Sequence, residues 1–160
     1  MRRPDPRWGE LFGPLPVALL ALWVLNDVYL KPAFHNFATG KLSDVAVCFV
    51  MPLFVSELLG LTLGLAPKRR LAAGAAVTAV LFTALEVVPA ASALAVGLLR
   101  SLGPYLGLGR SFAMTSDWTD LACVPMVFAA YAYANARLGG NTGAQRTRAA
   151  RATDVASPLQ

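Results

Sequence analysis

Four apolar stretches, each long enough to cross a lipid bilayer, constrain this chain more than any other feature. A bilayer-spanning helix needs about 20 mostly apolar residues, and such stretches lie at 11–30, 45–66, 71–99 and 118–138. None of them alternates apolar and polar residues as a membrane β-strand does. Apolar residues make up 56% of the chain and charged residues only 14%, against roughly 25% charged residues in soluble domains. The sequence therefore predicts an all-α, four-helix transmembrane bundle over residues 1–138.

The distribution of basic residues predicts how this bundle is oriented. Ten of the 14 Lys and Arg residues lie before the first span, between the second and third, or at and beyond the end of the fourth. Cytoplasmic connections carry the excess of Lys and Arg, so both termini are expected in the cytoplasm of a bacterial inner (plasma) membrane protein. The segments 31–43 and 100–117 then face outward. Residues 139–160 are expected to form a disordered basic tail, which lacks the aromatic residues that stack on bases, so no nucleic-acid partner is expected.

Acidic residues are concentrated around the spans. Six of the nine lie in or next to a span: Asp27, Asp44, Glu57, Glu86, Asp117 and Asp120. Ionisable side chains at membrane depth are costly and usually face the bundle interior or a water-filled cavity. With a helical rise of about 1.5 Å per residue, all of them except Glu57 fall in the outer half of the bilayer. Together with Asn26, Lys31 and Lys41 they form a candidate outward-facing binding cluster.

Two Ser/Thr-Asp pairs, Ser43–Asp44 and Thr119–Asp120, each begin a span from the outer side. This pattern is typical of helix capping, which accounts for both pairs without any function. The alternative is an aspartyl dyad, because two carboxyl groups held close in a low dielectric do not both ionise easily and together activate water. Asp44 and Asp120 are the candidate catalytic pair if spans two and four lie side by side.

Local pairing and repetition give further expectations. Asp27 and Lys31 are four residues apart on one helix face and are expected to form an ion pair, and Lys41 is expected to pair similarly with Asp44. The shared order of Ser/Thr, Asp, apolar residue and Ala also favours a parallel repeat that relates spans one and two to spans three and four. His35 and the two cysteines lack metal-site spacing, and cofactor motifs are missing. No metal and no cofactor are therefore expected.

Two families resemble parts of this chain. The segments Asn26-Asp27-Val28-Tyr29-Leu30-Lys31 and Thr39-Gly40-Lys41-Leu42-Ser43-Asp44 resemble the N-D-x-x-L-K and T-G-K-L-S-D segments of small uncharacterised bacterial four-span membrane proteins. That resemblance implies the fold and no particular activity. The region around Asp44 also resembles lipoprotein signal peptidase, a four-span protein with both termini inside and two aspartates near the outer face. This second resemblance implies a catalytic role for Asp44, although the family's other aspartate motif is missing and the segments occur in a different order.

Two kinds of function fit these observations. The first is a small non-enzymatic inner-membrane component or carrier whose acidic residues and lysines pair internally or handle ions, with the lipid bilayer and other membrane proteins as partners. The second is a membrane-embedded hydrolase, in which Asp44 and Asp120 activate water while Asn26 and Lys41 orient a lipid or lipidated protein. Because a complete catalytic signature is missing, the sequence favours the first.

Overall fold

The computed structural model describes residues 9–34, 36–107 and 117–155 of the chain. Within these ranges the chain is helical and contains no β-strand, which confirms the predicted all-α class. Four segments of the described chain are long and apolar enough to cross a membrane, as expected for a four-helix transmembrane bundle: Pro14–Phe34, Phe37–Leu63, Pro67–Val87 and Trp118–Gly140.

The first span contains a change of helix type. It begins as α1 (Pro14–Leu25), continues as a π-helical turn, η1 (Asn26–Leu30), and ends as α2 (Lys31–Phe34). Proline suits the start of α1 because the first turn of a helix does not need its missing N–H group. A π-helical turn carries more residues than an α-helical one, and such turns occur frequently at functional sites.

The second span is longer than the sequence predicts. It is α3 (Phe37–Leu63), which begins eight residues before the expected start at 45. The reason is Asn36, whose side chain accepts a hydrogen bond from the Thr39 N–H group and so caps the helix ahead of Ser43. Most of the expected external segment 31–43 is therefore helical. At its other end α3 stops at Gly64, which adopts the left-handed conformation (φ 61°) typical of helix C-termini.

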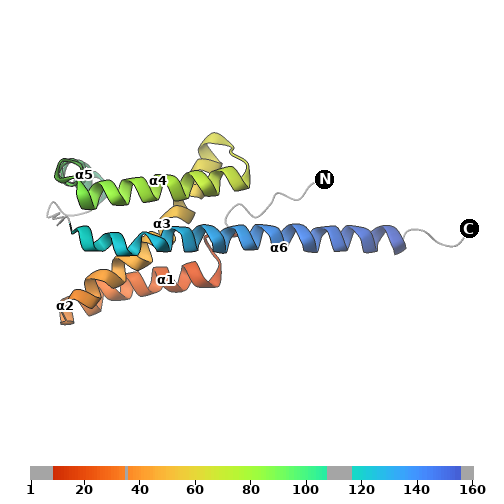
Figure 1. The fold of residues 1–160 in the computed structure, drawn as a ribbon, viewed down its shortest axis with the longest axis horizontal. Coiled ribbons are helices and arrows are strands. Elements are labelled where there is room, and N and C mark those ends of the chain that lie inside the picture. The colour runs from red at the N-terminus through yellow and green to blue at the C-terminus, as the bar shows by residue number, and fades with distance from the viewer. Residues whose placement is uncertain (1–8, 35, 108–116, 156–160) are drawn as a thin grey trace, which may run out of the picture.

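The third span is shorter than the sequence predicts. The expected helix over 71–99 is divided into α4 (Pro67–Val87) and α5 (Pro89–Leu102), joined by Val88 in an extended conformation. A residue before proline disfavours the α-helical region, and Pro89 has no N–H group to continue the helical ladder. As a result α5 turns away from the axis of α4 (Figure 1). The 3₁₀ turn η2 (Gly103–Leu106) follows, and residues 108–116 of the expected external segment lie outside the described chain.

The fourth span extends well beyond the bundle. It begins with the 3₁₀ turn η3 (Trp118–Cys123) and continues as α6 (Pro125–Val155). Where the sequence predicts a disordered tail from 139, the structure continues the helix to Val155 (Figure 1). Seven of the 17 residues in 139–155 are Ala or Arg, which are strong helix formers. Figure 1 also shows that α1 begins and α6 ends at the same end of the bundle.

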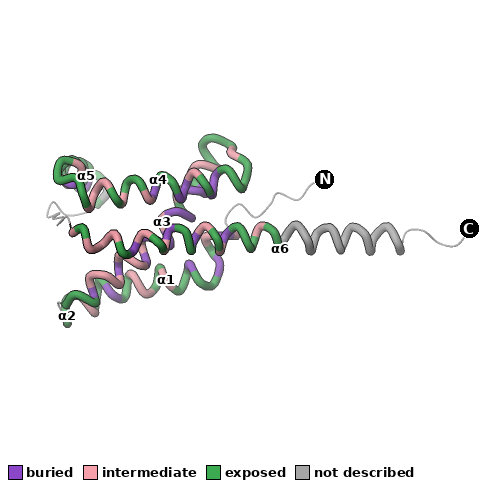
Figure 2. Tube along the Cα trace, in the orientation of Figure 1, coloured by how far each residue is buried: buried purple, intermediate pink, exposed green. Residues whose placement is uncertain are grey.

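The core forms around α3, which packs against α1, α4 and α6, while α4 also packs against α6. Buried apolar residues make two clusters: Phe49, Leu53, Leu71, Ala130 and Ala134, and then Cys48, Ala75, Cys123 and Val127. Figure 2 shows the buried residues gathered where α3 passes its neighbours, whereas most of α1 is exposed. Exposed apolar side chains along α1, such as Leu20 and Val24, suit contact with lipid tails. These features are those of a membrane-embedded protein.

Candidate functional site

The structure brings the eight residues of the predicted site to one end of the bundle. Each lies in or beside the end of a span, and Ser43 and Thr119 join them through hydrogen bonds. We call the ten residues the acidic cluster: Asn26, Asp27, Lys31, Lys41, Ser43, Asp44, Glu86, Asp117, Thr119 and Asp120. This end is opposite to the one at which α1 begins and α6 ends (Figure 1).

One half of the acidic cluster connects the first span to α3. Asn26 is fully buried, and its Nδ2 atom donates to the Thr39 carbonyl oxygen at 2.6 Å and to Ser43 Oγ at 2.7 Å. The Ser43 hydroxyl in turn donates to Asp27 Oδ1 at 2.7 Å. The predicted ion pair between Asp27 and Lys31 is confirmed, with Oδ1 and Nζ 2.9 Å apart. Asn26 and Asp27 lie in the π-helical turn, where both of these consecutive residues bond to Ser43 of α3.

The other half connects α3 to the fourth span through Lys41. Its Nζ atom donates to Thr119 Oγ1 at 2.6 Å and to the Asp120 carboxylate, and it lies 3.7 Å from Asp117 Oδ2. The expected partner, Asp44, lies one turn further along α3 and contributes only through its nearby charge. The expected Lys41–Asp44 ion pair is thus replaced, because η3 offers the lysine several oxygen acceptors at once.

Carboxyl groups from three spans meet around Asp44. Its carboxyl group is within hydrogen-bonding reach of that of Asp120 and within electrostatic range of Glu86. Glu86 Oε2 also accepts a hydrogen bond from the Asp117 backbone N–H at 2.9 Å, which ties the end of α4 to the start of η3. The cluster therefore holds five carboxyl groups and only two lysines, an arrangement that attracts cations.

Capping does not explain the two Ser/Thr-Asp pairs. Asn36 caps α3, so Ser43 lies in the second turn of the helix and uses its hydroxyl on Asp27 instead. Asp117 caps η3 by accepting a hydrogen bond from the Thr119 N–H group at 2.9 Å. Asp44 and the Thr119 hydroxyl are therefore available to the acidic cluster.

Asp117 is the member of the cluster that lies just outside the membrane spans. The Thr119 hydroxyl donates to its Oδ1 at 2.7 Å, in addition to the backbone N–H bond. These two hydrogen bonds, assisted by the nearby Lys41 charge, hold the pKa of Asp117 below its ordinary value of 3.8. Asp117 is consequently ionised at neutral pH.

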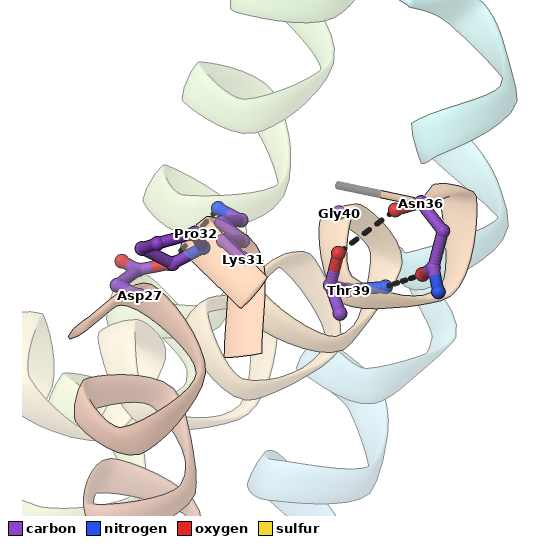
Figure 3. Close-up of a pocket in the computed structure, with 6 residues that line it drawn as sticks. All are labelled: Asp27, Lys31, Pro32, Asn36, Thr39 and Gly40. Atoms are coloured by element: carbon purple, nitrogen blue, oxygen red, sulfur yellow. Dashed lines mark hydrogen bonds and ion pairs between the residues drawn. The ribbon is translucent and has the colours of Figure 1, made fainter. Parts of the chain in front are cut away.

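A cleft opens beside the first half of the cluster. It has a volume of about 440 Å³ and is lined by Asp27, Lys31, Pro32, Asn36, Thr39 and Gly40. Figure 3 shows the first three residues on one side, at the end of the first span, and the other three on the first turn of α3. The ion pair between Asp27 and Lys31 therefore lies on the wall of this cleft.

A second charged group, which the sequence analysis did not identify as a site, lies at the other end of the bundle. Arg70 donates from Nη1 to Glu57 Oε2 at 2.5 Å and from Nη2 to Glu10 Oε2 at 3.0 Å, and all three residues are buried. We call these residues the charged triad. A cavity of about 200 Å³ lies beside Glu57 and Arg70. In the sequence, Glu10 and Arg70 each lie directly before an expected span, 11–30 and 71–99, and both spans start from the same side of the membrane. This shared position is the signal from which their pairing could have been predicted.

Within the described chain, no three His, Cys, Asp or Glu side chains form a group that could hold a metal ion. No family model, curated protein or solved structure matches this chain.

Proposed function

We propose that this protein is a small bacterial inner (plasma) membrane component or carrier that binds a small cation at its acidic cluster. Both termini lie in the cytoplasm in this proposal, and the acidic cluster faces outward. The observation that carries it is the meeting of the Asp44 and Asp120 carboxyl groups, with Glu86 close by, at the end of the bundle.

The charge distribution supports this orientation. Arg69 and Arg70 begin α4 at the end of the bundle where α1 starts, and Arg137 follows on α6. The end that carries the acidic cluster has few basic residues, of which Lys31 and Lys41 are already ion-paired. A cytoplasmic location of the basic end agrees with the excess of Lys and Arg found in cytoplasmic connections.

The balance of charge within the cluster supports cation binding. Lys41 lies among Asp117, Asp120 and Asp44, so three carboxyl groups share one ammonium group. Neighbouring carboxyl groups in a medium of low dielectric repel each other when both are ionised. A bound proton or monovalent cation relieves that repulsion.

Orientation is tested by labelling with a membrane-impermeant maleimide in intact cells. Both native cysteines are buried, so the Phe34→Cys and Ala66→Cys variants each introduce a reactive thiol at an exposed position at or just beyond the end of a span. Phe34→Cys is expected to label from outside, whereas Ala66→Cys labels only after the membrane is opened. The reverse pattern would reject the proposed orientation.

Cation binding is tested with purified protein in liposomes adsorbed on a solid-supported membrane. A sudden increase in proton or Na⁺ concentration is expected to give a charge-displacement current in the wild-type protein, and the ion that gives it identifies the ligand. Asp44→Asn and Asp120→Asn are expected to lose at least nine-tenths of the signal. Asp154→Asn makes the same chemical change far along α6 and serves as the control. An unchanged signal in both cluster variants would refute the site.

The contact between Asp44 and Asp120 also favours a second candidate, an aspartate-dependent hydrolase. Two carboxyl groups within hydrogen-bonding reach have the geometry of a pair that activates water. Its substrate would be a lipid or lipidated protein at the outer leaflet, with Lys41 orienting it. Asn26 is fully buried and uses its amide hydrogens on Thr39 and Ser43, so in either function it positions Asp27. This candidate would be selected by two results together. The wild-type protein, but not Asp44→Asn, would release product from a synthetic lipopeptide, and the wild-type protein would give no charge-displacement current.

A further inference from the structure

Facing rows of residues run the length of the contact between α3 and α4. Residues four apart share a helix face, and these rows are Asp44, Cys48, Pro52, Ser56 and Gly60 on α3, and Arg70, Gly74, Thr78, Phe82 and Glu86 on α4. A Cβ atom on Gly74 would lie 2.5 Å from the Pro52 carbonyl oxygen and 2.8 Å from the Ser56 nitrogen. At the two ends, Gly60 contacts Arg70 and Asp44 lies near Glu86. The rows therefore face each other between the charged triad and the acidic cluster.

Two hydroxyl groups buried in this contact have no protein partner. Ser56 Oγ and Thr78 Oγ1 are buried, and neither makes a hydrogen bond within the described chain. Their residues expose 0% and 7% of their surface. Buried polar groups in proteins are almost always hydrogen-bonded, and where protein groups do not serve, an ordered water molecule does. A water molecule beside each hydroxyl would supply the missing partner.

The backbone of α3 supplies another polar group in the same contact. Pro52 lies inside the helix and has no N–H group, so the Cys48 carbonyl lacks its usual helical donor. Cys48 is fully buried. Thr78 faces the same stretch of α3, one turn away from Gly74. A hydroxyl and a carbonyl oxygen thus stand between the two charged ends.

The charged triad lies at one end of the α3–α4 contact, and one of its carboxylate oxygens has no hydrogen-bond partner among the described residues. Glu57 follows Ser56 directly, and its Oε1 atom is buried without a hydrogen-bond donor. The carboxyl group of Glu10 interacts directly with that of Glu57. Two carboxyl groups can bond to each other only when one carries a proton, so a single proton would complete the triad beside Arg70.

We propose that the α3–α4 contact is a proton pathway, in which Ser56, Thr78 and bound water connect the acidic cluster to the charged triad. The inference rests on the proposed function and names its cation as the proton. At each hydroxyl or water, one O–H bond forms as the proton arrives and another breaks as the next proton leaves. No intermediate group therefore changes its charge after a transfer is complete. Between Thr78 and Glu86, about 12 Å apart along α4, the two rows supply no hydroxyl, so a chain of water molecules beside Phe82 would carry the proton from one to the next. This stretch is expected to limit the rate.

The test measures proton entry into liposomes that contain the protein and the pH-sensitive dye pyranine, driven by a valinomycin-set potassium potential. The Ser56→Ala/Thr78→Val double variant removes both hydroxyls and is expected to slow wild-type entry at least tenfold. Thr78→Ser keeps a hydroxyl and is expected to retain most of the rate. Thr62→Val is the matched control, because Thr62 is an exposed α3 residue whose hydroxyl is already bonded to the Leu58 carbonyl.

The outcomes separate this inference from the proposed function. If Asp44→Asn abolishes proton entry while the double variant keeps the wild-type rate, the pathway is refuted and the cation site stands. If the wild-type protein admits protons no faster than empty liposomes, the pathway is refuted, and the charge-displacement current decides whether the cation site remains. Solid-state NMR of the wild-type protein provides a measurement that does not depend on any variant folding. The absence of magnetisation transfer from water to the Thr78 hydroxyl would overturn the inference.

Discussion

In the charged triad the side chains of Arg70, Glu10 and Glu57 expose only 9%, 6% and 1% of their surface, whereas Lys31 and Asp27 in the acidic cluster expose 42% and 43%. Both groups are ion-pair networks, and both join segments that are distant in the sequence. They differ in how far water reaches them. The triad is enclosed where Glu10, α3 and α4 meet, and the cluster opens to a cleft.

This difference separates ion pairs that hold the fold from ion pairs that can exchange partners. Removing one member of a buried pair leaves an uncompensated charge and is strongly destabilising. An exposed pair contributes little to stability because water replaces either partner. The Lys41 and Asp120 side chains of the acidic cluster, which expose 18% and 14% of their surface, lie between these extremes. The triad is therefore the region expected to tolerate the least change.

The sharpest test removes one cation from each region. Arg70→Ala leaves two buried carboxyl groups without their cation and is expected to lower the free energy of unfolding by about 3–5 kcal/mol. Lys31→Ala is expected to lower it by at most about 1 kcal/mol, because its pair with Asp27 is exposed. Chemical unfolding in mild detergent measures both, with the exposed Arg69→Ala as control. Equal losses for Arg70→Ala and Lys31→Ala would remove the distinction between the regions.

A pair of glycine substitutions extends the comparison from charge to packing. In Gly74→Ala the new methyl group would collide with backbone atoms of Pro52 and Ser56, and forcing α3 and α4 apart is expected to cost about 1–3 kcal/mol. Gly40→Ala has no atom within 4 Å of the new Cβ and is expected to stabilise α3 by up to about 1 kcal/mol. Thermal unfolding in detergent distinguishes them by the sign of the change. A neutral Gly74→Ala would show that the contact between the helices is loose.

Asn26 is a fully buried residue of the otherwise more exposed acidic cluster, so it tests whether burial alone decides how much a substitution destabilises the fold. Asn26→Ala removes both hydrogen bonds of a fully buried amide, leaving the Thr39 carbonyl and the Ser43 hydroxyl short of a donor. It is expected to lower the free energy of unfolding by about 1–3 kcal/mol. Asp27→Asn keeps an acceptor for Ser43 at a half-exposed position and is expected to cost under about 1 kcal/mol. Urea unfolding of both variants decides whether burial or membership of the cluster sets the effect.

The smallest expected effect concerns Asp117. Its pKa in the folded protein lies below 3.8, so its ionised form stabilises the fold at neutral pH, and that contribution is lost as the pH falls through the lowered pKa. Thr119→Val removes the hydroxyl donor and is expected to raise the pKa of Asp117 towards 3.8. The stability that this carboxyl group loses in acid then becomes smaller, because its folded and unfolded pKa values lie closer together. A ¹³C NMR titration of the Asp117 carboxyl group measures the change, and an unaltered pKa would assign the effect to the backbone N–H bond.

Much of the architecture could be predicted because it depends on properties that are local in sequence. Apolar length defines each span. Consecutive spans cross the bilayer in opposite directions, so spans two and four begin on the same side, and counting residues was enough to bring Asp44 and Asp120 to one end. The break at Val88 was harder, since a proline in a membrane helix is compatible with a kink as well as with an end. The observed separation of α4 and α5 depends on how the chain packs afterwards.

The partners within each network could not be predicted, because they depend on the rotation of one helix against another. Lys41 is three residues from Asp44, yet it pairs with Asp120 because of where η3 lies. In a membrane protein, an arginine between two spans is first read as a marker of the cytoplasmic side. The residues around Arg70 do not distinguish it from the neighbouring, exposed Arg69. Its role in the charged triad follows from the close approach of α4 to Gly60 of α3.

The π-helical turn at Asn26–Leu30 leaves this protein sensitive to a single-codon deletion. An α-helix advances by about 100° per residue, so loss of one residue from the turn would restore regular winding while rotating everything before it. The span would still cross the bilayer and would pass any test of hydrophobic length. Asn26 would then no longer reach the Thr39 carbonyl and the Ser43 hydroxyl, and the first span would lose its polar connection to α3 with its reading frame intact.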